Sequence, residues 1–488
     1  MASTPIGNIQ IRCAAGDEDI RVLSRLAREI WTEHYPAIIG MDQVAYMLEH
    51  FQSESAIARD IAENGYCYEL ARIDGTPVGY AAFRVDADKG EIFLGKLYLL
   101  RSYRGRGIAR LMLDRIVQAG RAAGCGWVRL TVNKKNTASI AVYEAMGFAV
   151  FDEVKTEIGG GFYMDDYVLR LQVPLPSVAT ADINFRDPFV LVHDGTYYLY
   201  GTEGATCWQG NPGRLQVYIG TDLESWDGPR ACFTPPEGFW ADRNFWAPEC
   251  HFHDGAFYLF VTFKAENRCR GTQILRADCP EGPFRPVSDG PFTPPGWECL
   301  DGTLHVDCDG RPWGVFCHEW VQIGNGTVCA IRLKPDLSGP ADPTAAPVVL
   351  FAAHDAAWVT GIPKKNHVPD WPEELGYVTD GPFLQPLPGG CLLMGWSSFS
   401  GDRRYTIGQA VSSHGITGPW TQLAQPIYDQ DGGHGMFFCT LDGRRMLAIH
   451  RPNQTLMERP VFLEIEEAGQ GFRVKTASAG PKHRGRNH

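Results

Sequence analysis

Four carboxylates and one histidine recur at matching places in the second half of the chain. They are Asp187 in FRDPFV, Glu249 in WAPECH, Asp301 in CLDGTL, Asp380 in VTDGPF and His434 in GGHGMF. Carboxylates that gather in one place raise some of each other's pKa values. One protonated and one ionised carboxyl together provide what cleavage of a glycosidic bond requires. The alternative is structural: each acid begins a strand and bonds backbone amides.

The same residues begin five copies of one local pattern. Each copy is an apolar run, a turn at Asp-Gly or Gly-Gly, and a second apolar run, as in FVLVHDGTYYLYGT (189–202). The turn glycines are Gly195, Gly255, Gly310, Gly390 and Gly443. Each interval can hold a four-stranded blade, so the pattern predicts an all-β five-bladed β-propeller over 183–472. The inner strand of each blade lines the axis, and the five polar residues would meet there.

A second group of residues suits the binding of a phosphorylated molecule. The segment 93–116 reads as a strand, a turn and a helix, and Arg104, Gly107 and Ala109 in it fit the pattern R-x-x-G-x-A. Small residues let backbone N–H groups approach a pyrophosphate, and the helix dipole favours its negative charge. The next segment, 127–148, predicts a strand, a turn that contains an asparagine, and a helix that ends in Y-E-x-x-G-F.

Apolar periodicity assigns these segments to an N-terminal α/β domain over 1–173, with a mixed, mostly antiparallel sheet. The predicted helices are 17–34, 41–63, 107–123 and 136–146, and the predicted strands are 66–73, 77–85, 90–100, 127–133, 148–155 and 162–172. The stretch 174–182 is rich in proline and small residues and predicts a linker. The basic end of the chain, 473–488, predicts a disordered tail.

Composition excludes some classes of partner. The net charge is −12, which argues against nucleic acid or an anionic membrane as the main partner. There is no run of about 18 apolar residues, so no transmembrane helix is expected. The first residues lack the order of a signal peptide, and the 14 cysteines form no C-x-x-C pair. We therefore expect free thiols and a cytoplasmic protein, whose sugar substrates would be short oligosaccharides.

The two N-terminal segments together resemble the GNAT acetyltransferase superfamily over nearly all of 1–173. The resemblance implies acetyl-CoA as the cofactor. Its pyrophosphate would be held by the amides of Arg104, Gly105, Arg106, Gly107, Ile108 and Ala109. Strand 93–100 would splay from its neighbour to admit the thioester.

The resemblance also implies roles for single residues. Asn136 would lie near the cofactor, and Tyr143 would protonate the departing thiolate, with a packed helix tyrosine as the alternative. Glu91 is a candidate general base or a solvated strand-end carboxylate. The acceptor amine is not evident, although 30–49 resembles the same region of polyamine acetyltransferases.

The motifs R-D-P-F-V, C-L-D-G-T-L-H-V-D and D-G-G-H-G-M-F resemble glycoside hydrolase family 43 over about 183–465. That family contains five-bladed arabinofuranosidases, xylosidases and arabinanases. The resemblance implies that Asp187 is the general base and that Asp301 orients and tunes the acid. The segment T-D-G-P-F-L stands where the family usually has E-G-P, so Asp380 takes the place of the glutamate acid. Because Asp380 is one methylene shorter, Glu319 and Glu203 remain alternative acids.

The resemblance places His434 on the axis, where it would hold water or a calcium ion. A core histidine is the alternative. Aromatic side chains near the blade starts could form a floor under a sugar ring or pack in the core; they are Trp246, Trp297, Trp320 and Trp396. The predicted sugar-binding residues are Trp246, Glu249, Glu319 and His434.

Two functional interpretations follow. In the first, the chain is bifunctional: an inverting exo-glycosidase, foremost an α-L-arabinofuranosidase with β-xylosidase as the alternative, is joined to a separate acetyl-CoA-dependent N-acetyltransferase. Its partners are then a small oligosaccharide and an amine acceptor. In the second, the acetyltransferase is active and the propeller is a non-catalytic carbohydrate-binding or regulatory module.

Overall fold

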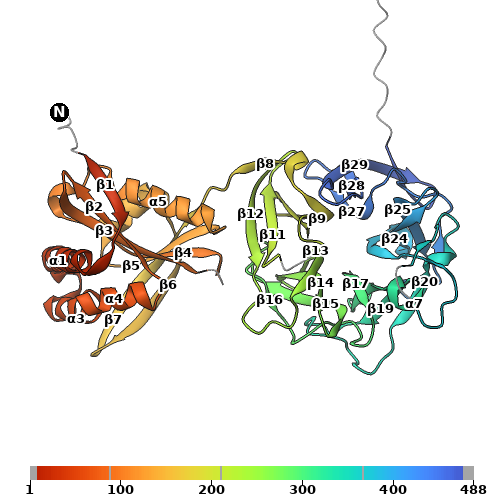
Figure 1. Ribbon diagram of the computed structural model, residues 1–488, viewed down its shortest axis with the longest axis horizontal. Helices are drawn as coiled ribbons and strands as arrows, with labels where there is room; N and C mark the ends of the chain where they lie inside the picture. The colour runs from red at the N-terminus through yellow and green to blue at the C-terminus, as the bar shows by residue number, and fades with distance from the viewer. Residues whose placement is uncertain (1–7, 87–88, 209–211, 365–367, 476–488) are drawn as a thin grey trace, which may run out of the picture. The chain divides into compact units, whose positions relative to one another are not determined.

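The computed structural model describes residues 8–86, 89–208, 212–364 and 368–475 of the chain. The chain forms two compact units, Met1–Leu175 and Pro176–His488, which are coloured red to orange and yellow to blue in Figure 1. Within the described ranges, no helix is long and apolar enough to cross a membrane. Of the predicted tail, residues 473 and 474 end strand β30, and 476–488 lie outside the described residues.

The first unit is an α/β domain built on a seven-stranded sheet of order β1-β2-β3-β4-β5-β7-β6. All neighbouring strands are antiparallel except β4 and β5. The strands are β1 (Ile9–Cys13), β2 (Cys67–Ile73), β3 (Thr76–Asp86), β4 (Glu91–Leu99), β5 (Trp127–Asn133), β6 (Ala149–Gly159) and β7 (Phe162–Gln172). The helices are α1 (Gly16–His34), α2 (Pro36–Ile39), α3 (Met41–Phe51), α4 (Glu54–Ala62), η2 (Arg101–Tyr103), α5 (Ile108–Ala122) and α6 (Thr137–Ala145).

The sheet is covered on both faces, because alternate residues of a strand point to opposite sides. On β3, Tyr80 and Ala82 pack with α1, α3 and α4, whereas Ala81 and Phe83 pack with α5. The helix predicted over 41–63 is two helices, since Ser53 caps α4 by accepting a hydrogen bond from the Ala56 amide at 3.3 Å.

The parallel strands β4 and β5 pair over only three residues. The pairing ends at Phe93 and Arg129, although β4 continues to Leu99 and β5 to Asn133. The predicted splaying of this strand is therefore confirmed. It opens a wedge in the sheet ahead of the start of α5.

The second unit is a propeller of five antiparallel blades with the inner strand of each blade on the axis (Figure 1). The first blade has the order β8-β12-β11-β10-β9: β8 (Ser177–Ala179), β9 (Phe185–His193), β10 (Thr196–Glu203), β11 (Leu215–Gly220) and β12 (Ser225–Phe233). The second is β13 (Arg243–His253), β14 (Ala256–Ala265), β15 (Arg268–Ala277) and β16 (Arg285–Pro286). The third is β17 (Cys299–Val306), β18 (Pro312–His318), β19 (Thr327–Arg332) and β20 (Val348–Ala352).

The fourth blade is β23 (Asp380–Pro386), β24 (Leu392–Ser400), β25 (Arg404–Ser412) and β26 (Thr421–Gln422). The fifth is β27 (Gly433–Cys439), β28 (Arg445–Arg451), β29 (Arg459–Ala468) and β30 (Gly471–Val474). A short pair, β21 (Ile362–Pro363) and β22 (Leu375–Gly376), and the short helices η3 (Thr180–Asp182), α7 (Trp320–Ile323), η4 (Ala353–Asp355) and η5 (Pro388–Gly390) complete the unit. Strand β8 lies within the stretch 174–182 that predicted a linker, and it pairs with β12.

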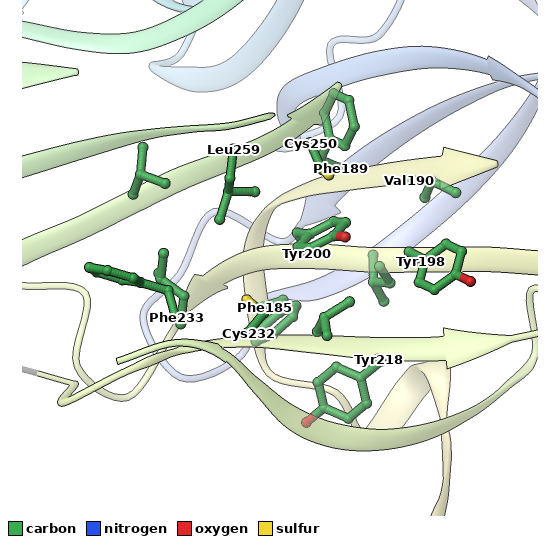
Figure 2. Close-up of a cluster of buried hydrophobic side chains, with 14 of the residues drawn as sticks. Phe185, Phe189, Val190, Tyr198, Tyr200, Tyr218, Cys232, Phe233, Cys250 and Leu259 are labelled. Atoms are coloured by element: carbon green, nitrogen blue, oxygen red, sulfur yellow. The ribbon is translucent and has the colours of Figure 1, made fainter. Parts of the chain in front are cut away.

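The five repeated turns join the first and second strands of the five blades. In two of them an Asp-Gly pair has positive φ at both residues, Asp194–Gly195 and Asp254–Gly255, which is the backbone of a tight two-residue hairpin. The repeat therefore identified the inner hairpin of each blade. Aromatic side chains fill the space between blades: Figure 2 shows Phe185, Tyr200 and Tyr218 with Cys232 and Cys250 in one buried cluster.

Side-chain hydrogen bonds, as well as packing, join the first and last blades of the propeller. The Arg186 guanidinium of the first blade pairs at 2.7 Å with Glu458, which precedes β29 and is fully buried. The side-chain amide of Asn184 donates a hydrogen bond to the backbone carbonyl oxygen of Glu458 at 3.0 Å. These bonds hold the first and last blades together beside Asp187, which follows Arg186 directly.

Candidate active sites

Every inner strand of the propeller has a β-bulge at the same place. Two residues on the inner strand oppose one on the second strand, and the first of the two has positive φ. These residues are Asp187 (φ 52°), Ala247 (45°), Asp301 (56°), Gly381 (52°) and His434 (46°). A bulge turns a side chain away from the regular strand alternation, and positive φ at a non-glycine residue is strain of the kind that gathers at functional sites.

The bulges correct the sequence-based alignment of the five polar residues. Asp187, Asp301 and His434 are equivalent, as predicted. Asp380 lies directly before its bulge, and Glu249 lies directly after its own, where it pairs across the sheet with Phe260. The Glu249 carboxylate is buried and lies 3.3 Å from Nε2 of His251.

Asp187 is held as a carboxylate. Its Oδ2 accepts a hydrogen bond from the Thr202 hydroxyl at 2.6 Å, and its Oδ1 lies 3.3 Å from Nδ1 of His434. Burial opposes the charge, but His434, Arg186 and the Thr202 bond outweigh it and hold the pKa of Asp187 below its ordinary value. An ionised carboxylate of this kind can accept a proton from water.

His450 supports the backbone of Asp187. The Asp187 amide donates to Nδ1 of His450 at 3.1 Å, so the proton of this ring is on Nε2, which faces Asn453 at 3.4 Å. Burial, with Arg186 nearby, lowers the pKa of His450 to about 3. The ring is therefore neutral at pH 7 and fixes the position of Asp187.

Asp301 lies on the other side of His434. Its Oδ2 is 3.6 Å from Nδ1 of His434 and accepts a hydrogen bond from the Gly381 amide at 3.0 Å. Burial and the charge of Asp187 raise the pKa of Asp301 well above its ordinary value. Gly381 is required here, because a Cβ atom would meet the His434 ring at 2.8 Å. One imidazole thus lies between two carboxyl groups of different acidity.

Asp380 has the properties of an acid. Burial and the charge of Asp301 raise its pKa to about 7, against the smaller opposing effect of His434. The Tyr405 hydroxyl donates to Oδ2 of Asp380 at 2.9 Å, and the Tyr405 ring stacks on His450 at a centroid distance of 5.5 Å. Because His450 accepts a hydrogen bond from the Asp187 amide, the two carboxyl groups are joined through Tyr405 and His450 in one connected set of side chains.

The alternative acids are differently placed. Glu319 is buried and forms an ion pair with Arg270; burial raises its pKa and Arg270 opposes the rise. Glu203 ends β10 opposite Phe185. Glu319 is one of the charges that raise the pKa of Asp380.

The four tryptophans predicted as a possible sugar floor differ in their surroundings. Trp246 donates to the Cys207 carbonyl at 2.6 Å, contacts Trp208 edge-on at 5.6 Å and lies under Arg270 at 4.5 Å. Trp208 is 56% exposed, so this pair can meet a ligand. Trp396 is fully buried and packs on Phe351, so of its two predicted roles the structure supports core packing.

The remaining two tryptophans have protein partners. Trp297 stacks on His318 at 4.1 Å. The Trp320 ring occupies the space beside Gly376, where a Cβ atom would come within 2.2 Å of it.

The first unit has a cavity of about 850 Å³ in the wedge between β4 and β5. Its lining includes 94–99 of β4 and 131–133 of β5, the segments in which these two strands no longer pair with each other. The turn before α5 and the first residues of this helix form one wall, to which Arg104, Gly105, Gly107, Ile108 and Ala109 contribute. Gly105 and Gly107 have φ of 74° and 79°, and Gly107 is the N-cap of α5. The first N–H groups of a helix lack intrahelical acceptors, so this turn presents donors to an anion.

Asn136 and Tyr143 also line the cavity. Asn136 caps α6, and its Oδ1 lies 3.3 Å from Nε2 of His34. Burial raises the pKa of Tyr143, so its hydroxyl stays protonated and can donate a proton. Glu91 lies elsewhere: its buried carboxylate bonds Arg129 at 2.9 Å and also pairs with Arg170. It is neither solvated nor available as a base, and both alternatives offered for it were wrong.

Several contributors were missed from the sequence. Tyr405 and Thr202 lie far from the acids along the chain, on second and third strands, and no motif marks them. In the first unit, Asp166 of β7 and Trp31 of α1 line the cavity. No sequence signal marked Asp166, because an isolated aspartate within a strand belongs to no motif.

Two family models match the chain. The model of glycosyl hydrolases family 43 matches residues 181–466, and the acetyltransferase (GNAT) family model matches residues 25–148. The propeller is similar to a crystal structure of an endo-arabinase from Bacteroides thetaiotaomicron, with 39% identity and a TM-score of 0.54. That match covers 60% of this chain and 97% of the endo-arabinase.

Curated relatives match each unit separately. An uncharacterized N-acetyltransferase of Mycobacterium bovis is 27% identical over 151 residues, which is 31% of this chain and 96% of the relative. An extracellular exo-α-(1→5)-L-arabinofuranosidase of Cellvibrio japonicus is 25% identical over 178 residues, covering 33% of this chain and 47% of the relative. The chain therefore spans about half the length of that arabinofuranosidase.

Proposed function

The chain belongs to glycosyl hydrolases family 43 and carries a GNAT acetyltransferase domain, and from this premise we propose that it is a bifunctional enzyme. The propeller removes a terminal pentose, foremost α-L-arabinofuranose, from short oligosaccharides with inversion. The GNAT domain transfers an acetyl group from acetyl-CoA to an amine. The likeness to an endo-arabinase and an arabinofuranosidase supports arabinose over xylose as the sugar.

One observation carries the glycosidase proposal: Asp187 has a lowered pKa, while Asp380 has a pKa raised to about 7. Groups whose environments push their pKa values apart are suited to act as base and acid. Asp187 takes a proton from a water molecule, and that water attacks the anomeric carbon. Asp380 protonates the leaving oxygen as the glycosidic bond breaks. Asp301 is a positioning residue that orients His434 and raises the pKa of Asp380.

Calcium has no part in this proposal. Calcium takes six to eight oxygen ligands, whereas His434 offers nitrogen, and its Nδ1 already faces Asp187 and Asp301 at 3.3 and 3.6 Å. In the described parts of the chain, no three acidic, histidine or cysteine residues form a group that could hold a metal. The residues around His434 do not fit a calcium site.

The acetyl transfer rests on the cavity beside the α5 turn. The amides of this turn would hold the pyrophosphate, and the wedge between β4 and β5 would admit the thioester arm. Bound acetyl-CoA supplies the acetyl group as a thioester. Tyr143, protonated and on the cavity wall, would donate a proton to the thiolate.

The test is release of pentose by the full chain from α-1,5-linked arabinotriose, with xylotriose as the comparison. We expect arabinose as the first product, with arabinobiose beside it. Sugar binding without turnover would favour the alternative that the propeller is a binding module. Release of internal fragments from polymeric arabinan would show that the enzyme cleaves within the chain and not at its end. We expect the protein in the cytoplasm, where the substrates are short oligosaccharides.

A further inference from the structure

The cavity of the first unit continues beyond the cofactor-binding turn into a region with mainly apolar walls. Trp31 and Tyr35 of the α1 region stack at 4.2 Å, and Tyr98 of β4 meets Trp31 edge-on at 5.9 Å. Met47 and Phe51 of α3 line the same cavity. A ligand that enters this region must present apolar surface to several aromatic rings.

One carboxyl group lies among these walls. Asp166 of β7 is the single acidic residue that lines the cavity within the described chain, and it is 6% exposed. Its Oδ1 atom has no hydrogen-bond partner among the described residues. A buried carboxylate oxygen without a partner is costly. Asp166 bonds Thr131 and also lines the cavity, so its carboxyl group has capacity to accept a further hydrogen bond from a ligand there.

A second polar atom in the same wall lacks a partner. The indole Nε1 of Trp31 is buried and makes no hydrogen bond within the described residues. Buried tryptophan N–H groups usually find an acceptor. Asp166 and Trp31 are therefore the two lining residues in the described chain that have a buried polar atom without a partner.

The cationic groups of the cavity restrict the charge of the ligand. Lys96, Arg104 and Arg110 all line it, and Lys96 is already paired with Asp60 at 3.0 Å. A polyamine would bring two or more ammonium groups to a single carboxylate and would meet these positive side chains. A ligand with one ammonium group leaves no charge unpaired.

We propose that the acetyl acceptor is a primary amine with one positive charge on an aromatic or aliphatic body, and that Asp166 receives its ammonium group and takes the proton. This inference rests on the proposed acetyl transfer and differs from the resemblance of 30–49 to polyamine acetyltransferases.

The proposed step balances in atoms and charge. The ammonium group loses one proton to Asp166, which passes it to solvent, and the free nitrogen bonds to the thioester carbonyl carbon. The C–S bond then breaks, and the thiolate takes a proton from Tyr143. The second proton lost by the nitrogen replaces the one that Tyr143 gave. The products are an acetamide and coenzyme A. Burial, with Asp165 nearby, raises the pKa of Asp166 to about 6, so it is ionised at pH 7 yet basic enough to take a proton.

The first test uses the unaltered full chain. Calorimetry measures acetyl-CoA binding, and thiol release measures transfer to 2-phenylethylamine, tyramine and spermidine. We expect kcat/KM for the two monoamines to exceed that for spermidine by about tenfold or more, because each unpaired buried charge costs more than 1.4 kcal/mol. Binding of acetyl-CoA with spermidine as the best acceptor overturns this inference alone. If acetyl-CoA does not bind, the proposed transferase fails as well.

The second test is Asp166→Asn, which keeps the shape and removes the charge. We expect kcat/KM for 2-phenylethylamine to fall by about 10²–10⁴-fold, while affinity for acetyl-CoA changes by less than about twofold. The matched control is Glu157→Gln, since Glu157 is an exposed carboxylate of β6 that does not line the cavity, and this variant should keep the transfer rate. Retained transfer in Asp166→Asn would overturn the proposal. Equal loss of acetyl-CoA binding would show that Asp166 is only structural.

Discussion

The alkaline limb of the glycosidase pH profile should belong to Asp380. The proposed acid works only while it is protonated, and burial with the Asp301 charge raises its pKa to about 7. At pH 8 about a tenth of the molecules would keep the proton, and at pH 9 about a hundredth. An aspartate with the ordinary value of 3.8 would reach a tenth near pH 5. Pentose release should therefore fall about tenfold per pH unit above pH 7.

Asp380→Asn should remove this limb and reveal the leaving-group dependence of the acid. A nitrophenolate leaves with little protonation, whereas a sugar needs nearly complete proton transfer. The variant should therefore lose about 10²–10⁴-fold on arabinotriose and far less on a nitrophenyl arabinofuranoside. The assay is kcat/KM for both substrates from pH 5 to 9.

Glu203→Gln serves as the control, because Glu203 is not among the main groups that shift the pKa of Asp380. This variant should keep both the alkaline limb of the pH profile and the rate of pentose release. If Asp380→Asn slows both substrates equally and keeps the alkaline limb, Asp380 only positions other groups. Glu319 would then be the next residue to replace.

Three further predictions follow from the same contacts. Tyr405→Phe removes the hydrogen bond that lowers the pKa of Asp380, so the alkaline limb should move upward by about 0.5–1 pH unit; an unmoved limb would contradict this. Gly107→Val places a branched side chain at φ 79° on the cavity wall and should weaken acetyl-CoA binding by tenfold or more in calorimetry; unchanged affinity would defeat the assignment of this turn. A chain divided between Leu175 and Pro176 keeps β8 with the propeller, and both parts should unfold cooperatively by calorimetry; an insoluble propeller would refute their independence.

Local patterns accounted for most of the fold. The Asp-Gly turns at 194–195 and 254–255 depend on two residues each, and the five inner hairpins followed from such turns. The R-x-x-G-x-A turn likewise placed the start of α5 to within one residue. The break between α3 and α4 was missed, because the Ser53 cap interrupts an apolar periodicity that continues on both sides.

The alignment of the acids depended on bulges that alternation cannot reveal. A signal was present: the second residue of every bulge is proline or glycine, namely Pro188, Pro248, Gly302, Pro382 and Gly435. Aligning these would have placed Glu249 and Asp380 correctly. The contact of Tyr405 with Asp380 is set by the packing of distant strands in the propeller, and α1 and β7 bring Trp31 and Asp166 to one cavity. No short segment contains either pair.

The most direct measurement of the central claim is the configuration of the released sugar, followed by NMR as it forms. The proton-transfer roles of Asp187 and Asp380 predict that the full chain releases the β-anomer of L-arabinofuranose from an α-linked substrate. Asp187→Asn should lower this release by about 10²–10⁴-fold. Release of the α-anomer, or an Asp187→Asn variant that keeps most of the activity, would contradict the account.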